Sequence, residues 1–414
     1  MATKYDSGSK RRRHLDNGEN DSHSDAAELS VVPGRHRRRR RTILRVLFRL
    51  VITAVVVSAG LFVYVNWDRL EPEYLLVWIN EKLAGGESGD GFPFEITGSS
   101  VINMQSTRDG LALLTNNSLV LLNSKGGEVF RRSHGFSKPI MRSNGKYILI
   151  ADSGGNRIRL ETRVSTVREL NLENRITSVD VGSSGSFAVA TDSARGYTSE
   201  VAVYKLRGEE PIFRWYDSSL IILDVAISPN EDSLAVVGVT AEGGAMKSFL
   251  KIFEFNKKDP VAQYSQDGLM LFKVGFFPGG TIAAVGDSAV WVFNKSGTIQ
   301  QKHSFNDRKI AGYVIGDSAV SVALSNYGGS DGGTVMTVNS SGDKAYEADF
   351  EGTFRSMDSY GSQVVMLTSE HMYRIDIKGE SHLGEAVKDG RIISTMGRKL
   401  MVLGLTSIAE SELP

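Results

Sequence analysis

The chain has 414 residues, 41% of them hydrophobic, so it can bury a sizeable core and is not disordered as a whole. Lys+Arg and Asp+Glu are equal at 48 each, so the net charge indicates neither a nucleic-acid nor an acidic partner. The absence of cysteine excludes disulfides, thiolate metal sites and thiol nucleophiles, while 43 glycines against 9 prolines suit a fold with many tight turns.

Residues 1–42 are predicted to form a disordered, basic cytoplasmic tail. Residues 1–34 are polar with almost no apolar periodicity, and an arginine run interrupted only by His36 follows at 35–41. Such a run can bind nucleic acid, but beside an apolar segment it is more often a topology determinant that touches anionic lipid. We therefore expect no nucleic-acid partner.

Residues 43–66 are predicted to form a single transmembrane signal-anchor helix, with the lipid bilayer as its partner. Between Val46 and Asn66 the only charged residue is Arg49, and 13 side chains are Val, Leu, Ile or Phe. These side chains favour insertion by roughly 4–8 kcal/mol in total, whereas an arginine opposes it by about 3 kcal/mol at the bilayer centre and by less near a helix end. A signal peptide cleaved near residues 57–59 and a buried core helix are the alternatives.

The charges on either side of this segment predict its orientation. Arginines precede it, whereas the residues that follow include Asp68, Glu71 and Glu73 against a lone Arg69. Positively charged flanks stay in the cytoplasm, so the N-terminus is expected inside the cell and everything after residue 66 outside. The expected location is the cell membrane, with one pass and an extracytoplasmic C-terminal domain.

Residues 67–91 are predicted to form a juxtamembrane amphipathic helix followed by a neck. Apolar residues recur at helical spacing from Pro72 to Leu83, and proline suits the first turn of a helix. Gly85 and Gly86 would end the helix, and the glycine-rich stretch 86–91 would act as a flexible neck.

Residues 92–414 are predicted to form an all-β domain, a β-propeller. Short apolar runs are separated by Gly, Asn, Asp or Ser turns, and no helix of ten or more residues is evident. The runs group into repeats of about forty residues with four strands each, which is typical of propeller blades. The strands that open the eight repeats are expected at Val101–Met104, Ile140–Arg142, Ile176–Val181, Ile222–Ile227, Leu271–Phe276, Ile310–Val314, Phe354–Met357 and Ile392–Met396.

Eight opening strands favour eight blades. Seven blades are the alternative, and a β-helix or a two-domain sandwich are the competing folds. The last repeat, Arg391–Leu413, ends before a fourth strand, whereas Phe92–Ile96 precedes the first repeat without a partner. We therefore predict that the N-terminal strand completes the last blade and closes the ring, which removes both exposed sheet edges.

No catalytic, cofactor-binding or metal-binding residue is predicted. Gly328–Gly332 matches the G-x-S-x-G pattern, but its flanks have the pattern of strands, so we expect a hairpin loop instead of a nucleophile elbow. Ala151–Ile158 resembles the turn between the middle strands of NHL-type propeller repeats, in which Asp and Asn side chains bond the turn backbone. A calcium or ligand contact is the alternative for that turn.

Histidines and carboxylates are scattered through the predicted propeller. The histidines lack metal-ligand spacing and are expected at the surface: His134, His303, His371 and His382. Paired acid–base chemistry would need two carboxylates facing one pocket. The candidates near strand ends are Asp180, Asp224, Asp287, Asp317 and Asp358. The string Asp-Ser-Ala-Val occurs at both 287–290 and 317–320, which favours a role in turns.

The stretch Gly91–Val101, together with Leu70–Glu73 and Trp78–Ile79, resembles a family of single-pass bacterial membrane proteins identified as a domain of unknown function. The resemblance covers most of the chain from the membrane segment onward. It implies an anchored propeller at the envelope of Gram-positive-type bacteria. It assigns no activity, so no catalytic residue can be transferred.

The expected function is a binding or scaffold module for an envelope component or a membrane-protein partner. The alternative is a propeller enzyme, either a hydrolase, a lyase or a cofactor-dependent oxidoreductase, with its site in the central funnel. A third possibility is a signalling adaptor whose basic tail binds a cytoplasmic partner. Charged side chains converging on the ring axis would favour the enzyme, whereas a broad apolar and aromatic patch would favour binding.

Overall fold

The computed structural model describes residues 36–65, 89–193, 195–326, 331–385 and 387–413. It separates into two compact units, Met1–Glu71 and Pro72–Pro414. The predicted disordered tail up to residue 35, the juxtamembrane helix and the neck up to residue 88 lie outside the described residues.

Helix α1 (His36–Val65) has 30 residues and begins within the arginine run, before the start predicted at residue 43. Its described side chains, from Val46 to Leu61, are exposed, and the large apolar ones among them are 47–67% accessible. Within the part of the chain that is described, no helix is both long enough and apolar enough to cross a membrane. The span proposed at 43–66 therefore stays a prediction.

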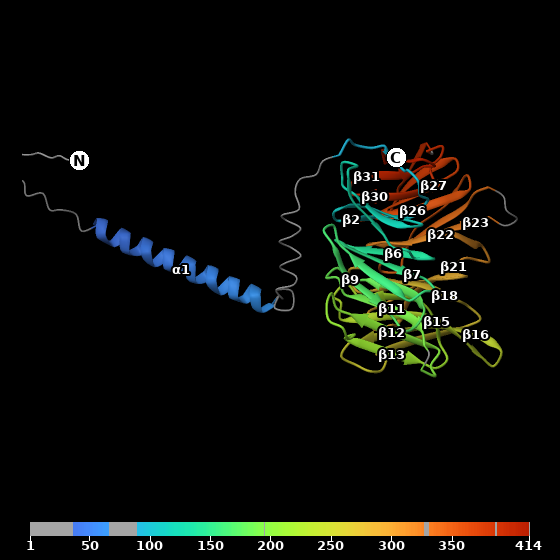
Figure 1. The fold of residues 1–414 in the computed structure, drawn as a ribbon, viewed down its shortest axis with the longest axis horizontal. Helices are drawn as coiled ribbons and strands as arrows, with labels where there is room; N and C mark the ends of the chain where they lie inside the picture. The colour runs from blue at the N-terminus through green and yellow to red at the C-terminus, as the bar shows by residue number, and fades with distance from the viewer. Residues whose placement is uncertain (1–35, 66–88, 194, 327–330, 386, 414) are drawn as a thin grey trace, which may run out of the picture. The chain divides into compact units, whose positions relative to one another are not determined.

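The second unit is a β-propeller of eight antiparallel four-stranded sheets, as predicted, and not of seven (Figure 1). We number the blades 1 to 8 by their innermost strands, and each predicted opening strand falls on one of these. The innermost strands are β2 (Val101–Thr107), β6 (Pro139–Asn144), β10 (Ile176–Val181), β14 (Ile221–Ile227), β18 (Leu271–Phe276), β22 (Lys309–Ile315), β26 (Phe354–Tyr360) and β30 (Ile392–Met396).

The remaining strands follow outward from the axis in each blade. The second strands are β3 (Gly110–Thr115), β7 (Tyr147–Asp152), β11 (Phe187–Asp192), β15 (Ser233–Glu242), β19 (Ile282–Gly286), β23 (Ala319–Ser325), β27 (Gln363–Thr368) and β31 (Lys399–Leu403). The third strands are β4 (Ser118–Leu122), β8 (Arg157–Glu161), β12 (Ser199–Tyr204), β16 (Ala245–Glu254), β20 (Ala289–Phe293), β24 (Gly333–Asn339), β28 (His371–Asp376) and β32 (Ser407–Ser411). The outer strands are β5 (Glu128–Ser133), β9 (Thr166–Asn171), β13 (Phe213–Asp217), β17 (Ala262–Asp267), β21 (Ile299–Ser304), β25 (Lys344–Phe350), β29 (Ser381–Glu385) and β1 (Phe94–Glu95).

The hydrophobic core lies between the blades. One cluster joins Tyr147 and Leu149 of blade 2 to Val189 and Tyr204 of blade 3, and comparable clusters lie between other neighbouring blades. Second and third strands are therefore covered on both faces, and β3, β4, β19 and β20 are buried throughout. This explains why these strands have continuous apolar sequences, whereas the outer strand β17 alternates between half-buried and exposed residues.

The last blade is assembled from both ends of the propeller sequence. Strand β1 pairs antiparallel with β32, so that Phe94 lies opposite Ile408 and Glu95 opposite Ser407. The amide of Ile96 adds a hydrogen bond of 2.7 Å to the carbonyl of Thr406. The predicted ring closure is confirmed.

The ring has two faces, defined by the direction in which the strands run. The turns between first and second strands and between third and fourth strands lie on one face, which we call the neck face. The chain enters the ring there, because the amide of Gly91 donates to the carbonyl of Lys125 in the turn between β4 and β5 (2.9 Å). The turns between second and third strands, and the connections between blades, lie on the opposite face, which we call the far face.

Close packing of blades 6 and 7 generates a first prediction. A Cβ atom at Gly312 in β22 would meet the ring of Phe354 at 2.2 Å, whereas a Cβ at Gly279 would meet nothing within 4 Å. We expect Gly312→Ala to lower the free energy of unfolding by about 1–3 kcal/mol. Gly279→Ala, the matched control, should be neutral or slightly stabilising. Urea unfolding of both variants measures the difference, and equal stability of the two would contradict the packing described.

The closing strand pair generates a second prediction, which concerns an engineered disulfide. The chain has no natural cysteine that could form a competing disulfide. Since Ile96 donates to Thr406, Glu95 and Ser407 form a non-hydrogen-bonded pair, whose Cα atoms typically lie about 4.5 Å apart, within disulfide range. We expect Glu95→Cys/Ser407→Cys to oxidise within one chain and to stabilise it by up to about 4–5 kcal/mol, because the closed loop exceeds a hundred residues.

The control for this experiment is Glu95→Cys/Glu410→Cys, because Glu410 lies on the same strand but is not opposite Glu95. Mobility on a non-reducing gel and the urea midpoint are the two readouts. Equal oxidation of the two pairs would show that the register of the closing strands is different.

Candidate functional site

An open cavity of about 490 Å³ lies on the neck face, among the innermost strands of five consecutive blades. Its lining comes from the ends of β6, β10, β14, β18 and β22 and from the turns that follow them. A second cavity of about 460 Å³ continues from it between blades 4 and 5. The two cavities share Ser228, Pro229, Phe276 and Pro278, so together they form one groove from the axis outward.

Four charged side chains from four successive blades converge at the axial cavity: Arg142, Asp180, Asp224 and Lys273. The Nζ atom of Lys273 lies 2.7 Å from Oδ2 of Asp224, and a guanidinium nitrogen of Arg142 lies 4.0 Å from Oδ1 of the same carboxylate. Asp224 is only 3% exposed, so its charge requires this compensation. With two carboxyl groups and two cations, the cluster balances its charges internally.

The carboxylates of the innermost strands also join neighbouring blades. An innermost strand has one edge without a strand partner, so its amides need other acceptors. In three cases a carboxylate accepts a hydrogen bond from a backbone amide of the next blade. These are Asp180 from Ile227 (2.8 Å), Asp224 from Val274 (3.1 Å) and Asp358 from Thr395 (2.7 Å). A structural role thus accounts for much of the carboxylate chemistry at the axis.

Burial changes the proton affinity of two of these groups. Desolvation raises the pKa of Asp180 to about 6, because it outweighs the amide of Ile227 and the positive charges of Lys273 and Arg142. Burial likewise raises the pKa of Asp358. Near pH 6, Asp180 therefore exists both as an acid and as a carboxylate.

The structure separates the five carboxylates singled out in the sequence. Asp180 and Asp317 line the axial cavity, and Asp224 contacts Lys273, which also lines it. Asp358 belongs to blade 7 and Asp287 to a turn on the far face, and neither contributes to the lining. The repeated string Asp-Ser-Ala-Val occupies two inequivalent turns, one on each face, which agrees with a role in turns.

One prediction about the histidines is wrong. His134, expected at the surface, is 5% exposed, because the short connection between β5 and β6 folds it inward. Its Nε2 lies 3.1 Å from the carbonyl of Thr115, its Nδ1 accepts from the amide of Phe136 (3.0 Å), and desolvation lowers its pKa. His134 is a neutral internal residue. His303 is partly buried against the carbonyl of Gly342 (2.7 Å), whereas His382 is exposed.

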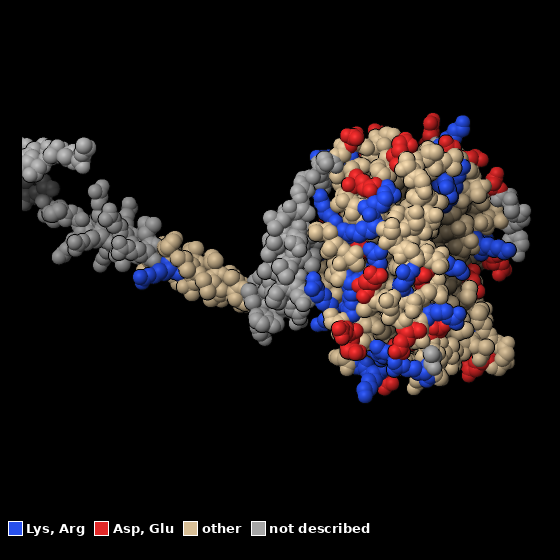
Figure 2. Space-filling model, in the orientation of Figure 1, with Lys and Arg blue, Asp and Glu red and all other residues tan. Residues whose placement is uncertain are grey.

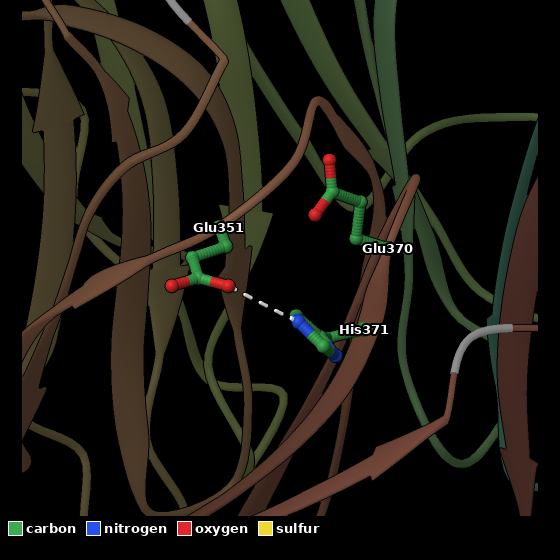
Figure 3. Close-up of side chains that lie close together, drawn as sticks. All are labelled: Glu351, Glu370 and His371. Carbon is green, nitrogen blue, oxygen red and sulfur yellow. Dashed lines mark hydrogen bonds and ion pairs between the residues drawn. The ribbon is translucent and has the colours of Figure 1, made fainter.

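His371 approaches two carboxylates on the far face of blade 7. Its Nε2 lies 3.2 Å from Oε2 of Glu351, and one atom each of Glu351, Glu370 and His371 lie within 4.8 Å of one another (Figure 3). Such a donor set could hold a divalent transition metal. Both glutamates are exposed, however, and the Glu351 side chain is 77% accessible, so the three groups are not held in a fixed geometry. Sequence reasoning missed the trio because Glu351 lies 20 residues before His371.

The two pattern matches in the sequence each lie between neighbouring strands of one blade. The G-x-S-x-G match at 328–332 falls between β23 and β24, which pair antiparallel, but residues 327–330 lie outside the described residues. In the NHL-like stretch, Oδ1 of Asp152 accepts from the amides of Ser137 (2.9 Å) and Lys138 (2.8 Å), and Gly154 has a φ of 77°. This Asp thus joins its turn to the preceding inter-blade connection.

A family model describes the same region of the chain. The model of the family of unknown function DUF5711 matches residues 93–413, which covers the propeller from its first strand to its last. The chain belongs to DUF5711. No curated protein matches this member of the family.

Solved structures resemble this DUF5711 member in fold alone. The C-terminal WD40 domain of Sif2 superposes with a TM-score of 0.56 at 14% identity, covering 78% of this chain and 99% of that one. Hydrazine synthase of Kuenenia stuttgartiensis gives a TM-score of 0.46 at 11% identity, covering 79% of this chain and 100% of that one. The likeness to the WD40 domain shows a propeller and assigns no activity.

The raised pKa of Asp180 generates a third prediction. An unfolded Asp titrates near 3.8, whereas folded Asp180 titrates near 6, so between these values the folded state binds more protons. Its contribution to stability is therefore full below about pH 4 and is lost as the pH rises through 6. Asp180→Asn keeps an acceptor for Ile227 and removes the titration. Between pH 4 and pH 7, the free energy of unfolding of the variant should rise by about 1–3 kcal/mol relative to that of the wild type.

Urea unfolding at several pH values between 4 and 7 measures this gain. Asp287→Asn, which changes an exposed carboxylate in a far-face turn, is the control and should leave the pH dependence unaltered. If Asp180→Asn and the control follow the same pH dependence, the desolvation of Asp180 is not as described.

Proposed function

We propose that this protein is a membrane-anchored propeller that binds an envelope component or a membrane-protein partner outside the cell. The anchor is supported by α1, whose large apolar side chains between Val46 and Leu61 are exposed and belong to no hydrophobic cluster of the described residues. A continuous apolar surface of this kind requires lipid or a partner to cover it. The arginine run at its start supports an N-terminus in the cytoplasm.

The observation that carries the binding role is the axial cavity with its continuation between blades 4 and 5. The charge of Asp224 is neutralised by Lys273, and Asp180 and Asp224 already accept bonds from neighbouring blades. Such a cavity offers a ligand donors and acceptors in fixed positions. On the side of the propeller that Figure 2 shows, Lys and Arg are interspersed with Asp and Glu.

The position of the cavity favours a partner that is itself held in the membrane. The chain enters the ring on the neck face, at the contact between Gly91 and Lys125, and β32 also ends on that face. The axial cavity opens on the same face. A ligand therefore meets the cavity on the side from which the proposed tether leaves.

One observation favours the alternative of an enzyme with a site in the central funnel. Charged groups do converge on the axis, and the pKa of Asp180 near 6 suits a general acid or base near neutral pH. An enzyme of this kind would also need a second group free to move a proton. Asp224 is committed to Lys273, Ser178 and the amide of Val274, which leaves the exposed Asp317 as the other carboxylate in the lining.

The proposed anchor generates a fourth prediction. An aspartate near the centre of a membrane helix costs about 2.5–3.5 kcal/mol, so two of them offset the roughly 4–8 kcal/mol gained by the apolar side chains. We expect Ile52→Asp/Val56→Asp to move the full chain from the carbonate-resistant membrane fraction to the soluble fraction. The matched control, Ile52→Leu/Val56→Leu, should remain in the membrane fraction.

Orientation is measured separately with a protease-cleavable tag after Pro414. Protease added to intact spheroplasts should remove the tag from the wild-type chain. A tag that is cleaved only after the membrane is permeabilised would place the ring in the cytoplasm and would overturn the proposal.

A further inference from the structure

A third cavity, distinct from the axial groove, lies between blades 2 and 3. It has a volume of about 470 Å³, and we call it the blade 2–3 slot. Its floor is one face of the blade 3 sheet, where Val189, Thr191 and Ala202 leave room because their side chains are small. Asn171–Asn174, at the end of β9 and in the connection that follows, forms the opposite wall.

The polar groups of the slot are paired so that little net charge remains. Arg214 lies 3.0 Å from Oε1 of Glu200, and Arg195 lies 3.2 Å from Oε2 of Glu173. Glu210 adds one further carboxylate to the lining. The electrostatic attraction for a charged ligand is therefore weak, and a phosphate or carboxylate ligand would be repelled.

Glu200 nevertheless keeps capacity to accept hydrogen bonds. It is 8% exposed, and besides Arg214 it has a long bond of 3.4 Å from the side-chain amide of Asn174. A carboxylate has about four acceptor positions, so a buried one with so few donors can accept further donors from a ligand.

Tyrosine rings complete the slot. Tyr204 and Tyr216 both line it, and Tyr216 stacks on the exposed ring of Tyr197 with centroids 5.0 Å apart. The hydroxyl of Tyr216 accepts a bond of 3.2 Å from Arg214, which fixes the ring next to the charged pair. The slot thus combines the ring of Tyr216 with the donors and acceptors of Arg214 and Glu200, which neighbouring groups hold in place, whereas Arg195 and Glu173 are exposed. Tyr204 is 7% exposed and its ring stacks on Phe187, so Tyr216 is the tyrosine that offers a ring face to a ligand.

We infer that the blade 2–3 slot binds an uncharged saccharide chain. A pyranose ring has an apolar face that packs on tyrosine and a rim of hydroxyl groups that bond carboxylates, guanidinium groups and amides. An extended peptide fits less well, because the floor is a sheet face and offers no free strand edge for main-chain hydrogen bonds. The inference goes beyond the proposed function, since it adds a second binding site apart from the axial cavity and names an uncharged saccharide as its ligand.

The test uses the full chain in an amine-oxide detergent, because a sugar-headed detergent would compete for the slot. The probes are maltotetraose, cellotetraose and chitotetraose as neutral oligosaccharides and tetragalacturonate as an anionic one. Saturation-transfer NMR reports binding at millimolar concentration. We expect transfer to at least one neutral oligosaccharide, little transfer to tetragalacturonate, and an affinity that does not change with salt.

Tyr216→Ala should weaken that binding about tenfold, because a stacked aromatic contact and the fixed position of Arg214 are both lost. Tyr360→Ala is the matched control, since Tyr360 is an exposed tyrosine on blade 7 and its loss should leave the affinity unchanged. Glu173→Gln, at a side chain that is 77% exposed and cannot affect folding much, should give a smaller loss.

Absence of transfer to every neutral oligosaccharide, or an equal loss in Tyr216→Ala and Tyr360→Ala, would overturn the inference. A preference for tetragalacturonate that disappears at high salt would do the same and would indicate ionic recognition. These outcomes do not depend on the anchor, because Tyr216→Ala should remain in the membrane fraction. Failure of the saccharide inference and failure of the proposed location are therefore distinguishable.

Discussion

The short pairing of β1 with β32 holds the propeller together. Blades 1 to 7 are each built from one continuous stretch of chain, whereas blade 8 takes three strands from the end of the sequence and one from its beginning. Phe92, Phe94 and Ile96 pack against Val101 and Met401, so the closing strand joins the cores of blades 1 and 8. The core lies between blades, and each interface is formed by the facing sheets of two neighbouring blades. If the ring opened between blades 8 and 1, both of the apolar sheet faces at that interface would be exposed to solvent.

Closing the ring creates a second requirement at the axis, because the inner edges of the eight innermost strands have no strand partner for their backbone hydrogen bonds. Side chains that reach across to the next blade supply some of these hydrogen bonds. Carboxylates accept from amides at three of these junctions, and Gln105, Ser143 and Asn144 donate to carbonyls of neighbouring blades at others. The positions that look most catalytic in the sequence are thus partly required by the architecture. Ser143, Asn144 and Asp180, which make such contacts, also line the axial cavity on the neck face.

The sequence alone predicted the eight blades, the innermost strands and the closing strand. These follow from local patterns, because strands buried on both faces are apolar throughout and the turns are marked by Gly, Asp and Asn. The side chains that share a site were not predictable in this way. Arg142, Asp180, Asp224 and Lys273 come from four repeats, and only the curvature of the ring brings them together. The burial of His134 and the contact of His371 with Glu351 likewise depend on connections between blades, whose course is not encoded in any periodicity.

The two strands that close the ring are the first and the last strands of the propeller to be synthesised. Strand β1 is synthesised first and must wait, unpaired, until β32 has been made. Intermediate blades can form as local hairpins in the meantime, but the pairing between Phe94 and Ile408 is the most non-local contact in the domain and is expected to be the slow step. During that interval β1 remains an unpaired strand with free edges. It can then pair wrongly with another copy of the chain or be bound by a chaperone.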